Sequence, residues 1–179
     1  EMESLKNFLL FKERQELYFD NIFKALKSHN IKALGMSENI HQWFLSRAQS
    51  VNPYQRIEDN RKVEIDTLLE LLNVIDSRID ARTLRIDGRG RVFLLINQQD
   101  KEISELSSGF TSLLKIMQSI VSGYAAFTNE VNIRHVGGVV IIDEIESHLH
   151  VGWQSQIIPK LKELLPNTIF YIATHSPLV

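Results

Sequence analysis

Two short segments near the C-terminal end of the chain, residues 139–142 and 169–173, constrain its fold more than any other feature. Their sequences are Val-Val-Ile-Ile and Ile-Phe-Tyr-Ile-Ala. Such continuous runs are typical of strands buried on both faces of a parallel sheet. Residues 150–165, which lie between them, predict a helix that Pro159 kinks and Pro166 ends. The order strand, helix, strand predicts a βαβ unit and therefore an α/β fold with parallel strands.

Polar residues follow both predicted strands. Asp143-Glu144 come directly after the first, and Thr174-His175 follow the second. Because ligands of open α/β sheets bind outside the carboxyl ends of the strands, we expect these residues at one edge. An aspartate there suits Mg²⁺, and a glutamate can take a proton from an attacking water, an effect worth about 10²–10⁴-fold in rate. On the dipeptide alone, acids that merely solvate a strand end explain the pattern equally well, and a lone histidine in this position more often only forms local hydrogen bonds.

A third motif, Leu106-Ser107-Ser108-Gly109, precedes a helix predicted over residues 110–127. The first turn of a helix has unpaired N–H groups and a positive dipole end, so it binds anions readily. Ordinary N-capping explains the two serines but not Gly109.

The rest of the chain divides by its hydrophobic period. Apolar residues at helical spacing predict helices over residues 5–27, 38–48 and 64–79, with a break at residues 30–37. The period then changes to two, which predicts a β-hairpin from residues 83 to 96 with its turn at Gly88 and Gly90. We therefore expect a mainly helical arm over residues 1–81, the hairpin within residues 82–103, and the α/β core over residues 104–179.

Composition excludes several classes of protein. The 179 residues are 44% hydrophobic and 23% charged, which is enough for one sizeable core. The net charge of -2 gives no global attraction to nucleic acid or anionic membranes. Cysteine is absent from the sequence, which excludes disulfides and cysteine metal sites. No apolar run approaches the roughly 20 residues of a membrane span, so we expect a soluble, cytoplasmic protein.

Two smaller patterns are ambiguous or weak. His148 and His150 alternate but have no third ligand nearby in sequence, so a metal site there is discounted. A dense basic cluster suggests a phosphate or DNA contact. The neighbouring acids Asp76, Asp80 and Asp87 favour a solvated face instead. The cluster consists of Arg78, Arg82, Arg85, Arg89 and Arg91.

Four motifs in order carry a resemblance to a known family. They are Leu106-Ser107-Ser108-Gly109, Asp143-Glu144, Glu146-Ser147-His148-Leu149-His150 and Thr174-His175-Ser176-Pro177. They resemble the signature, Walker B, following loop and switch of ABC-type P-loop ATPases, in the SMC-like and OLD-like branch. The resemblance covers about residues 104–179 and implies a P-loop NTPase core fragment that uses ATP and Mg²⁺.

The resemblance also implies roles for single residues. Asp143 would assist Mg²⁺, Glu144 would be the catalytic base and His175 would sense the γ-phosphate. Ser107, Ser108 and Gly109 would contact ATP bound to a second copy, so hydrolysis would require a head-to-tail dimer. Glu146 to His150 would form the loop that joins the two sites, with His150 among the nucleotide-binding residues. There are departures from the family pattern. Phe110 stands where an acidic residue or glutamine often follows the signature, and His150 replaces an aspartate. Gln98 and Gln99 lie too close to the signature to be assigned as the family's Mg²⁺-binding glutamine.

The sequence contains no Gly-x-x-x-x-Gly-Lys-Ser/Thr loop to hold phosphates. We therefore expect the chain to be a piece of a longer protein and to be inactive alone. The longer protein would dimerise around ATP and drive a partner activity, such as DNA repair or an anti-phage nuclease, with DNA or a nuclease as partner. The alternative is a non-catalytic assembly module, in which residues 1–80 recruit a partner and the ATPase-like core is structural.

Overall fold

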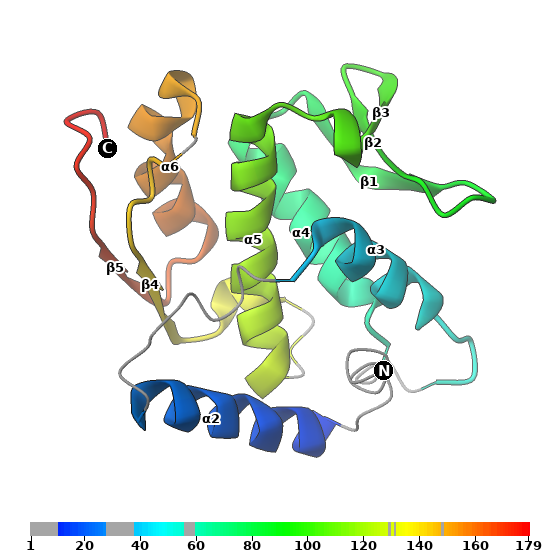
Figure 1. Cartoon of the computed structure of the whole chain (residues 1–179), viewed down its shortest axis with the longest axis horizontal. Helices are drawn as coiled ribbons and strands as arrows, with labels where there is room; N and C mark the ends of the chain where they lie inside the picture. The colour runs from blue at the N-terminus through cyan, green and yellow to red at the C-terminus, as the bar shows by residue number, and fades with distance from the viewer. Residues whose placement is uncertain (1–10, 28–37, 56–59, 129, 131, 148) are drawn as a thin grey trace.

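The computed structural model describes residues 11–27, 38–55, 60–128, 130, 132–147 and 149–179. Within these residues the fold combines a three-stranded antiparallel sheet, a parallel pair of strands and several helices. The long helix α5 (Ser108–Phe127) stands between the parallel pair and the antiparallel sheet (Figure 1). The expected α/β class with a parallel βαβ unit is confirmed.

Helices form most of the described residues that precede Ile79, as predicted. They are α2 (Phe11–Lys27), α3 (Ile40–Gln49) and α4 (Lys62–Ile75), while residues 1–10 and the predicted break lie outside the described residues. The prediction that the third helix continues to Ile79 is wrong. The Asp76 carboxylate accepts hydrogen bonds from the backbone and guanidinium of Arg78, which turns the chain after α4. Ile79 then begins a strand.

The predicted hairpin is present, but it is part of a larger sheet. Strand β1 (Ile79–Ile86) pairs with β2 (Val92–Ile96), which pairs in turn with β3 (Gln99–Glu102), a strand that the sequence did not predict. Asn97 and Gln98 have φ values of 51° and 61°, so both central residues of the β2–β3 turn are left-handed. Two-residue hairpin loops of this kind match the twist of the paired strands.

The hydrophobic core lies where α4 packs against α5, α3 and α6 (Val151–Leu164). Three hydrogen bonds between elements help to set the helix positions. Trp43 Nε1 donates to Ser122 Oγ at 2.8 Å and joins α3 to α5. Lys160 Nζ donates to the carbonyl oxygens of Val74 and Ile75 at 2.7 Å, which caps the end of α4 from α6. The largest fully buried side chains of the helices include Trp43, Phe44, Leu68, Leu69, Leu72, Leu113, Leu114 and Met117.

Strands β4 (Gly138–Ile142) and β5 (Thr168–Ile172) are parallel and paired in register from Gly138↔Thr168 to Ile142↔Ile172. Helix α6 connects them and runs through Pro159 to Leu164, so the predicted βαβ unit is confirmed. Within the described residues β5 is the only strand paired with β4.

The prediction that these strands are buried on both faces is wrong. Alternate side chains on one face pack against the core, but those on the other face are exposed, because the helices cover only one side of the pair (Figure 1). The exposed fraction of Ile141 is 79%. The exposed outer face consists of Val139, Ile141, Ile169 and Tyr171.

The carboxyl ends of β4 and β5 and the N-terminal ends of α5 and α6 all lie at the same end of the molecule, the upper end in Figure 1. All the motifs found in the sequence are therefore at or next to one end of the fold. Among the helices of the described residues, none is both long and apolar enough to cross a membrane.

Candidate functional site

The register of the parallel pair brings the two polar loops together. Because Ile142 pairs with Ile172, Asp143 and Ala173 both follow immediately after the last paired residues. Ala173 N donates to Ile142 O at 2.9 Å, and Ile145 N donates to Ala173 O at 3.5 Å. The loop after β4 therefore lies against the segment after β5, as expected for neighbouring parallel strands.

Two apolar side chains anchor the loop between β4 and α6. Ile145 and Leu149 are buried in the core, whereas Asp143 and Glu144 are exposed. Since the apolar residues turn inward, the acidic residues are presented to solvent at the carboxyl edge of the strands.

Glu144 has an unusual backbone conformation. Its φ is 49°, a left-handed value that costs a residue other than glycine about 1–3 kcal/mol. A turn holds this conformation, because Ser147 N donates to Glu144 O at 2.8 Å. The Ser147 hydroxyl also donates to Glu144 Oε2 at 3.2 Å, which orients the carboxylate. Strained backbone of this kind is concentrated at functional sites.

Glu146 joins the two loops. Its Oε2 accepts a hydrogen bond from the Thr174 hydroxyl at 2.6 Å, and its Oε1 accepts one from the backbone N–H of His175 at 2.8 Å. The hydrogen bonds from Thr174 and His175 hold the pKa of Glu146 below its usual value. The family resemblance places Glu146 in the loop that joins the two sites but predicts no partner for its side chain. The sequence does contain a signal for this contact. Glu146 follows β4 and Thr174 follows β5, and parallel neighbouring strands bring an acid and a hydroxyl in these positions close together.

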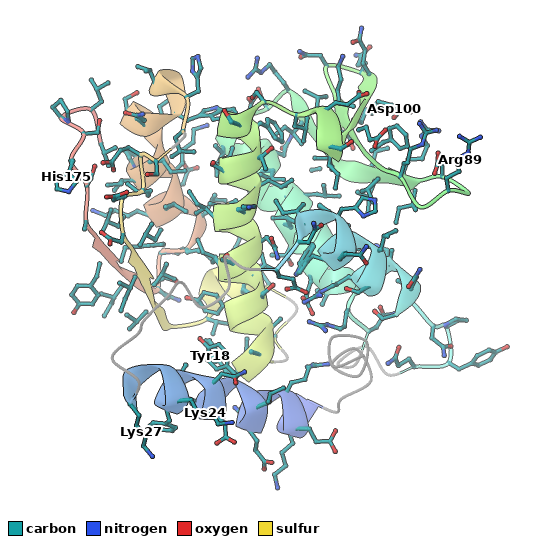
Figure 2. The ribbon with its side chains drawn as sticks, in the orientation of Figure 1. Tyr18, Lys24, Lys27, Arg89, Asp100 and His175 are labelled. Atoms are coloured by element: carbon teal, nitrogen blue, oxygen red, sulfur yellow. The ribbon has the colours of Figure 1, made fainter. Side chains whose placement is uncertain are left out.

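Further hydrogen bonds fix the segment after β5. Thr174 Oγ1 accepts from Ser176 N at 3.1 Å, and the Ser176 hydroxyl donates to Gln154 Oε1 on α6 at 2.9 Å. Gln154 Nε2 donates in turn to Leu149 O at 3.0 Å. His175 thus has a fixed backbone, and its exposed side chain points outward from this segment (Figure 2).

The signature serines lie at the start of α5. Ser107 is the N-cap, and its hydroxyl accepts from Phe110 N at 3.4 Å, so the capping interpretation is correct for this residue. Ser108, the first residue of the helix, is exposed, and Gly109 is buried. The N–H groups of this first turn point toward the end of the molecule at which β4 and β5 end (Figure 1).

His150 occupies the corresponding position on α6. It is the N-cap, and its Nδ1 accepts a hydrogen bond from Gly152 N at 3.2 Å. Because Nδ1 is the acceptor, a neutral His150 carries its proton on Nε2, which is then the ring nitrogen available to a ligand.

A pocket of about 680 Å³ brings the two N-caps together. Ser107 and His150 line it with Arg78 and Lys160, and Phe110 and Trp153 form an edge-to-face pair in its wall at 5.8 Å. Asp76 also lines the pocket and pairs with Arg78, so the two helix N-termini and Lys160 are what favour an anion here. The sequence did not identify Arg78 or Lys160 as pocket residues, because only the packing of α6 on the end of α4 places them there.

The predicted site residues thus form two groups. Ser107 and His150 line the pocket, whereas Asp143, Glu144 and His175 do not. This second group lies on the adjacent carboxyl edge of β4 and β5.

The donor set around Asp143 fits one kind of metal ion. Within the described ranges no group of three or more histidine, cysteine or acidic residues could hold an ion unaided, and His148 lies outside those ranges. Mg²⁺ needs only one or two carboxylates when phosphate oxygens and water supply its other ligands. Asp143 therefore fits Mg²⁺ that arrives with a phosphate ligand.

The basic cluster is largely neutralised by acids. Arg85 pairs with Asp100 at 2.7 Å, and Arg91 pairs with Asp87 at 2.8 Å. Both guanidinium groups also lie over the ring of Phe93. Arg89 extends from the tip of the hairpin toward solvent (Figure 2). These contacts favour the solvated-face interpretation over a DNA contact.

The sequence matches one family over residues 5–179, described as "AAA domain, putative AbiEii toxin, Type IV TA system". It is 28% identical to the Retron Vc95 probable ATPase of Vibrio cholerae over 89% of this chain and 32% of that protein. It is 24% identical to the Septu protein PtuA of Bacillus thuringiensis over 96% of this chain and 46% of that protein. The chain therefore spans less than half the length of either relative.

Among solved structures, the chain is similar to one described as the SMC head bound to the C-winged helix domain of ScpA. The TM-score is 0.45 and the sequence identity is 14%, over 78% of this chain and 46% of that chain.

Proposed function

The chain belongs to the AAA_21 family of P-loop ATPase domains, and from this membership we propose that it supplies the hydrolytic side of an ATP site. The observation that carries the proposal is the in-register pairing of β4 with β5. It puts Asp143, Glu144 and His175 on two adjoining loops at the carboxyl edge, where α/β proteins bind ligands.

Three residues perform the reaction in this proposal. Asp143 holds Mg²⁺, which neutralises charge on the phosphate oxygens when it is bound. Glu144 takes the proton of a water as its oxygen attacks the γ-phosphorus and the bond to the bridging oxygen of ADP breaks, giving ADP and inorganic phosphate. His175 donates a hydrogen bond to a γ-phosphate oxygen and stabilises its growing charge. The strained, hydrogen-bonded conformation of Glu144 supports its role as the base.

The second group of residues would act on a nucleotide held by another copy of the protein. Ser107, Ser108 and Gly109 offer hydroxyl and N–H donors at the start of α5, and His150 offers Nε2 at the start of α6. The pocket shared by Ser107 and His150 has Lys160 and the Arg78–Asp76 ion pair in its wall, and its two helix N-termini and Lys160 support an anionic ligand. Since these residues are separate from Glu144 and His175, we propose that two copies assemble head to tail around ATP.

The phosphate-binding loop is supplied by residues outside this sequence. No Gly-x-x-x-x-Gly-Lys-Ser/Thr segment occurs in the 179 residues, and such a loop provides most of the contacts to the phosphates. We propose that the part of the protein that carries the loop covers the exposed outer face of β4 and β5. An apolar face of this kind is rarely left open to solvent.

A second candidate function is a non-catalytic assembly module. The observation that favours it is the exposed apolar surface, which includes Phe19 and Phe23 on α2 as well as the outer face of β4 and β5. In this case the helical residues 1–80 would recruit a partner, and the ATPase-like core would be structural and would not turn over ATP. A nuclease or DNA partner is compatible with either candidate.

The experiment that tests the proposal compares the full-length protein with the 179-residue chain. We expect the full-length protein to release phosphate from ATP in the presence of Mg²⁺. We expect the 179-residue chain to bind ATP only weakly by calorimetry, because it lacks the phosphate loop. No phosphate release by the full-length protein would favour the assembly module. Tight ATP binding by the 179-residue chain would contradict the proposal that the phosphate loop lies outside it.

A further inference from the structure

Glu146 differs from the other acids at this edge because it contacts protein on both carboxylate oxygens. One oxygen accepts the Thr174 hydroxyl at 2.6 Å, and the other accepts the backbone N–H of His175 at 2.8 Å. Glu146 and Thr174 lie on two different loops and are 28 residues apart in the sequence. We propose that Glu146 is a positioning residue that sets where the His175 side chain lies relative to Asp143 and Glu144.

The anchoring of Glu146 supports this role. Its neighbour Ile145 is 1% exposed, and the N–H of Ile145 donates to Ala173 O at 3.5 Å. A buried side chain and a backbone hydrogen bond therefore fix the loop directly before Glu146. The backbone that carries the Glu146 carboxylate is thus rigid, so the carboxylate can fix the segment that it contacts.

The charge of Glu146 suits the two donors. An O–H and a backbone N–H both need an acceptor, and a carboxylate offers one oxygen to each. Hydrogen bonds to an ionised acceptor are stronger than those between neutral groups. The hydrogen bonds from Thr174 and His175 lower the pKa of Glu146, so the ionised acceptor is the stable form near neutral pH.

The backbone of His175 is held on two sides. Glu146 contacts Thr174 and His175 from the loop after β4, and Gln154 contacts the next residue, Ser176, from α6 at 2.9 Å. Because the side chain of His175 is exposed, these contacts to its backbone N–H and to the side chains on either side of it are what orient it in the absence of a ligand. Among the hydrogen bonds of the described residues, loss of Glu146 leaves the Gln154 contact as the one that ties residues 174–176 to another part of the fold.

This inference rests on the proposed ATPase function. It adds a residue that contacts neither ATP nor the attacking water. Positioning errors of about 1 Å can cost up to about 100-fold in rate, so we expect Glu146→Ala to lower kcat by about 10- to 100-fold. The KM for ATP should change little, because the phosphate loop lies elsewhere. Glu146→Gln keeps one oxygen for the His175 N–H and an amide that can donate to Thr174 Oγ1, so it should restore most of the lost kcat.

The test is a double-mutant cycle in the full-length protein, with steady-state ATP hydrolysis by Glu146→Ala, His175→Ala and the double variant. If Glu146 acts through His175, the double variant is no slower than His175→Ala alone. Losses in kcat that multiply would overturn the proposal, as would an unchanged kcat in Glu146→Ala. Glu163→Ala removes an exposed carboxylate from the far end of α6 and is the matched control.

A second measurement separates failure of this inference from failure of the proposed function. Hydrogen exchange of the full-length protein, read on the peptide with Thr174 and His175, should become faster in Glu146→Ala and stay near the wild-type rate in Glu163→Ala. Unchanged exchange would overturn the positioning role even if ATP is hydrolysed. An inactive wild-type protein, or an unchanged kcat in His175→Ala, would overturn the proposed function. The effect of Glu146 on kcat would then be overturned as well. Faster exchange in Glu146→Ala would still show that Glu146 holds the segment with Thr174 and His175. Thermal unfolding of each variant identifies any that fails to fold.

Discussion

The Tyr124 hydroxyl on α5 is hydrogen bonded to the Thr168 hydroxyl at the start of β5. Both residues are buried, and the contact fixes the parallel pair against the long helix whose N-terminus carries the signature serines. The two groups of site residues are thus joined through one rigid unit. The relative positions of α5, β4 and β5 at the site therefore depend on close packing at the opposite end of the strands.

The first prediction concerns this close packing. A Cβ atom at Gly138 would overlap the Tyr124 hydroxyl and lie 2.8 Å from Cζ of its ring, so Gly138→Ala must displace the ring and disturb its bond to Thr168. We expect the free energy of unfolding to fall by about 1–3 kcal/mol, the usual cost of overpacking. Denaturant unfolding measures the change. Gly88→Ala is the control, because nothing lies within 4 Å of its Cβ position, and an equal loss there would contradict the packing argument.

The second prediction concerns the buried ion pairs between α3 and α4. Glu64 is 4% exposed and accepts hydrogen bonds from Arg61 Nε at 2.6 Å and Arg47 Nε at 3.1 Å. Glu64→Gln removes the charge that both guanidinium groups contact, while Arg47 keeps its ion pair with Glu38 at 2.8 Å, so we expect a loss of about 1–3 kcal/mol in unfolding free energy. Asp66→Asn breaks the exposed pair with Lys62 and should cost at most about 1 kcal/mol. Similar losses in the two variants would contradict this account.

The third prediction is the pH dependence of stability that follows from Glu64. Burial by itself raises the pKa of Glu64, but Arg61 and Arg47 outweigh it and hold the pKa below the ordinary value of 4.5. The unfolded chain therefore binds the proton more readily, so stability is full above about pH 4.5 and falls as the pH drops further. Denaturant unfolding between pH 7 and pH 3 measures the profile. Glu64→Gln should flatten it, and an equally steep profile in that variant would assign the effect to other carboxylates.

The fourth prediction tests what covers the outer face of β4 and β5. The Ile141 side chain is largely exposed, so Ile141→Lys should change the stability of the 179-residue chain by no more than about 0.5 kcal/mol. In the full-length protein the same change should be clearly destabilising, because the phosphate-loop part would bury the lysine. Thermal unfolding of both proteins provides the comparison. An effect that is equally small in both would contradict the proposed cover.

Sequence patterns were sufficient where one local rule decides the outcome. The apolar spacing of α4 and α5 and the runs of β4 and β5 predicted these elements, and the parallel register follows from the βαβ order. The third strand was missed because Asn97 and Gln98 adopt left-handed conformations without the glycine that normally signals such a turn. The end of α4 was missed because it depends on a side-chain pair between Asp76 and Arg78.

The site shows the same limit. The positions of Asp143, Glu144 and His175 follow from the ends of parallel strands, so they could be predicted. The contacts of Glu146 with Thr174 and His175 depend on how the loop after β4 folds, and Ile145 determines that fold by its burial. The burial of both faces of β4 and β5 was overestimated, because hydrophobicity alone does not say which part of a protein supplies the cover.

The most direct test of the central claim is the Glu144→Gln variant of the full-length protein. Glutamine keeps the size of the side chain but cannot take the proton of the attacking water, so ATP should bind without being hydrolysed. We expect phosphate release to fall by about 100-fold or more, within the range for loss of a general base, and sedimentation with ATP and Mg²⁺ to detect a dimer that ADP does not support. Unchanged phosphate release by Glu144→Gln would contradict the assignment of the base.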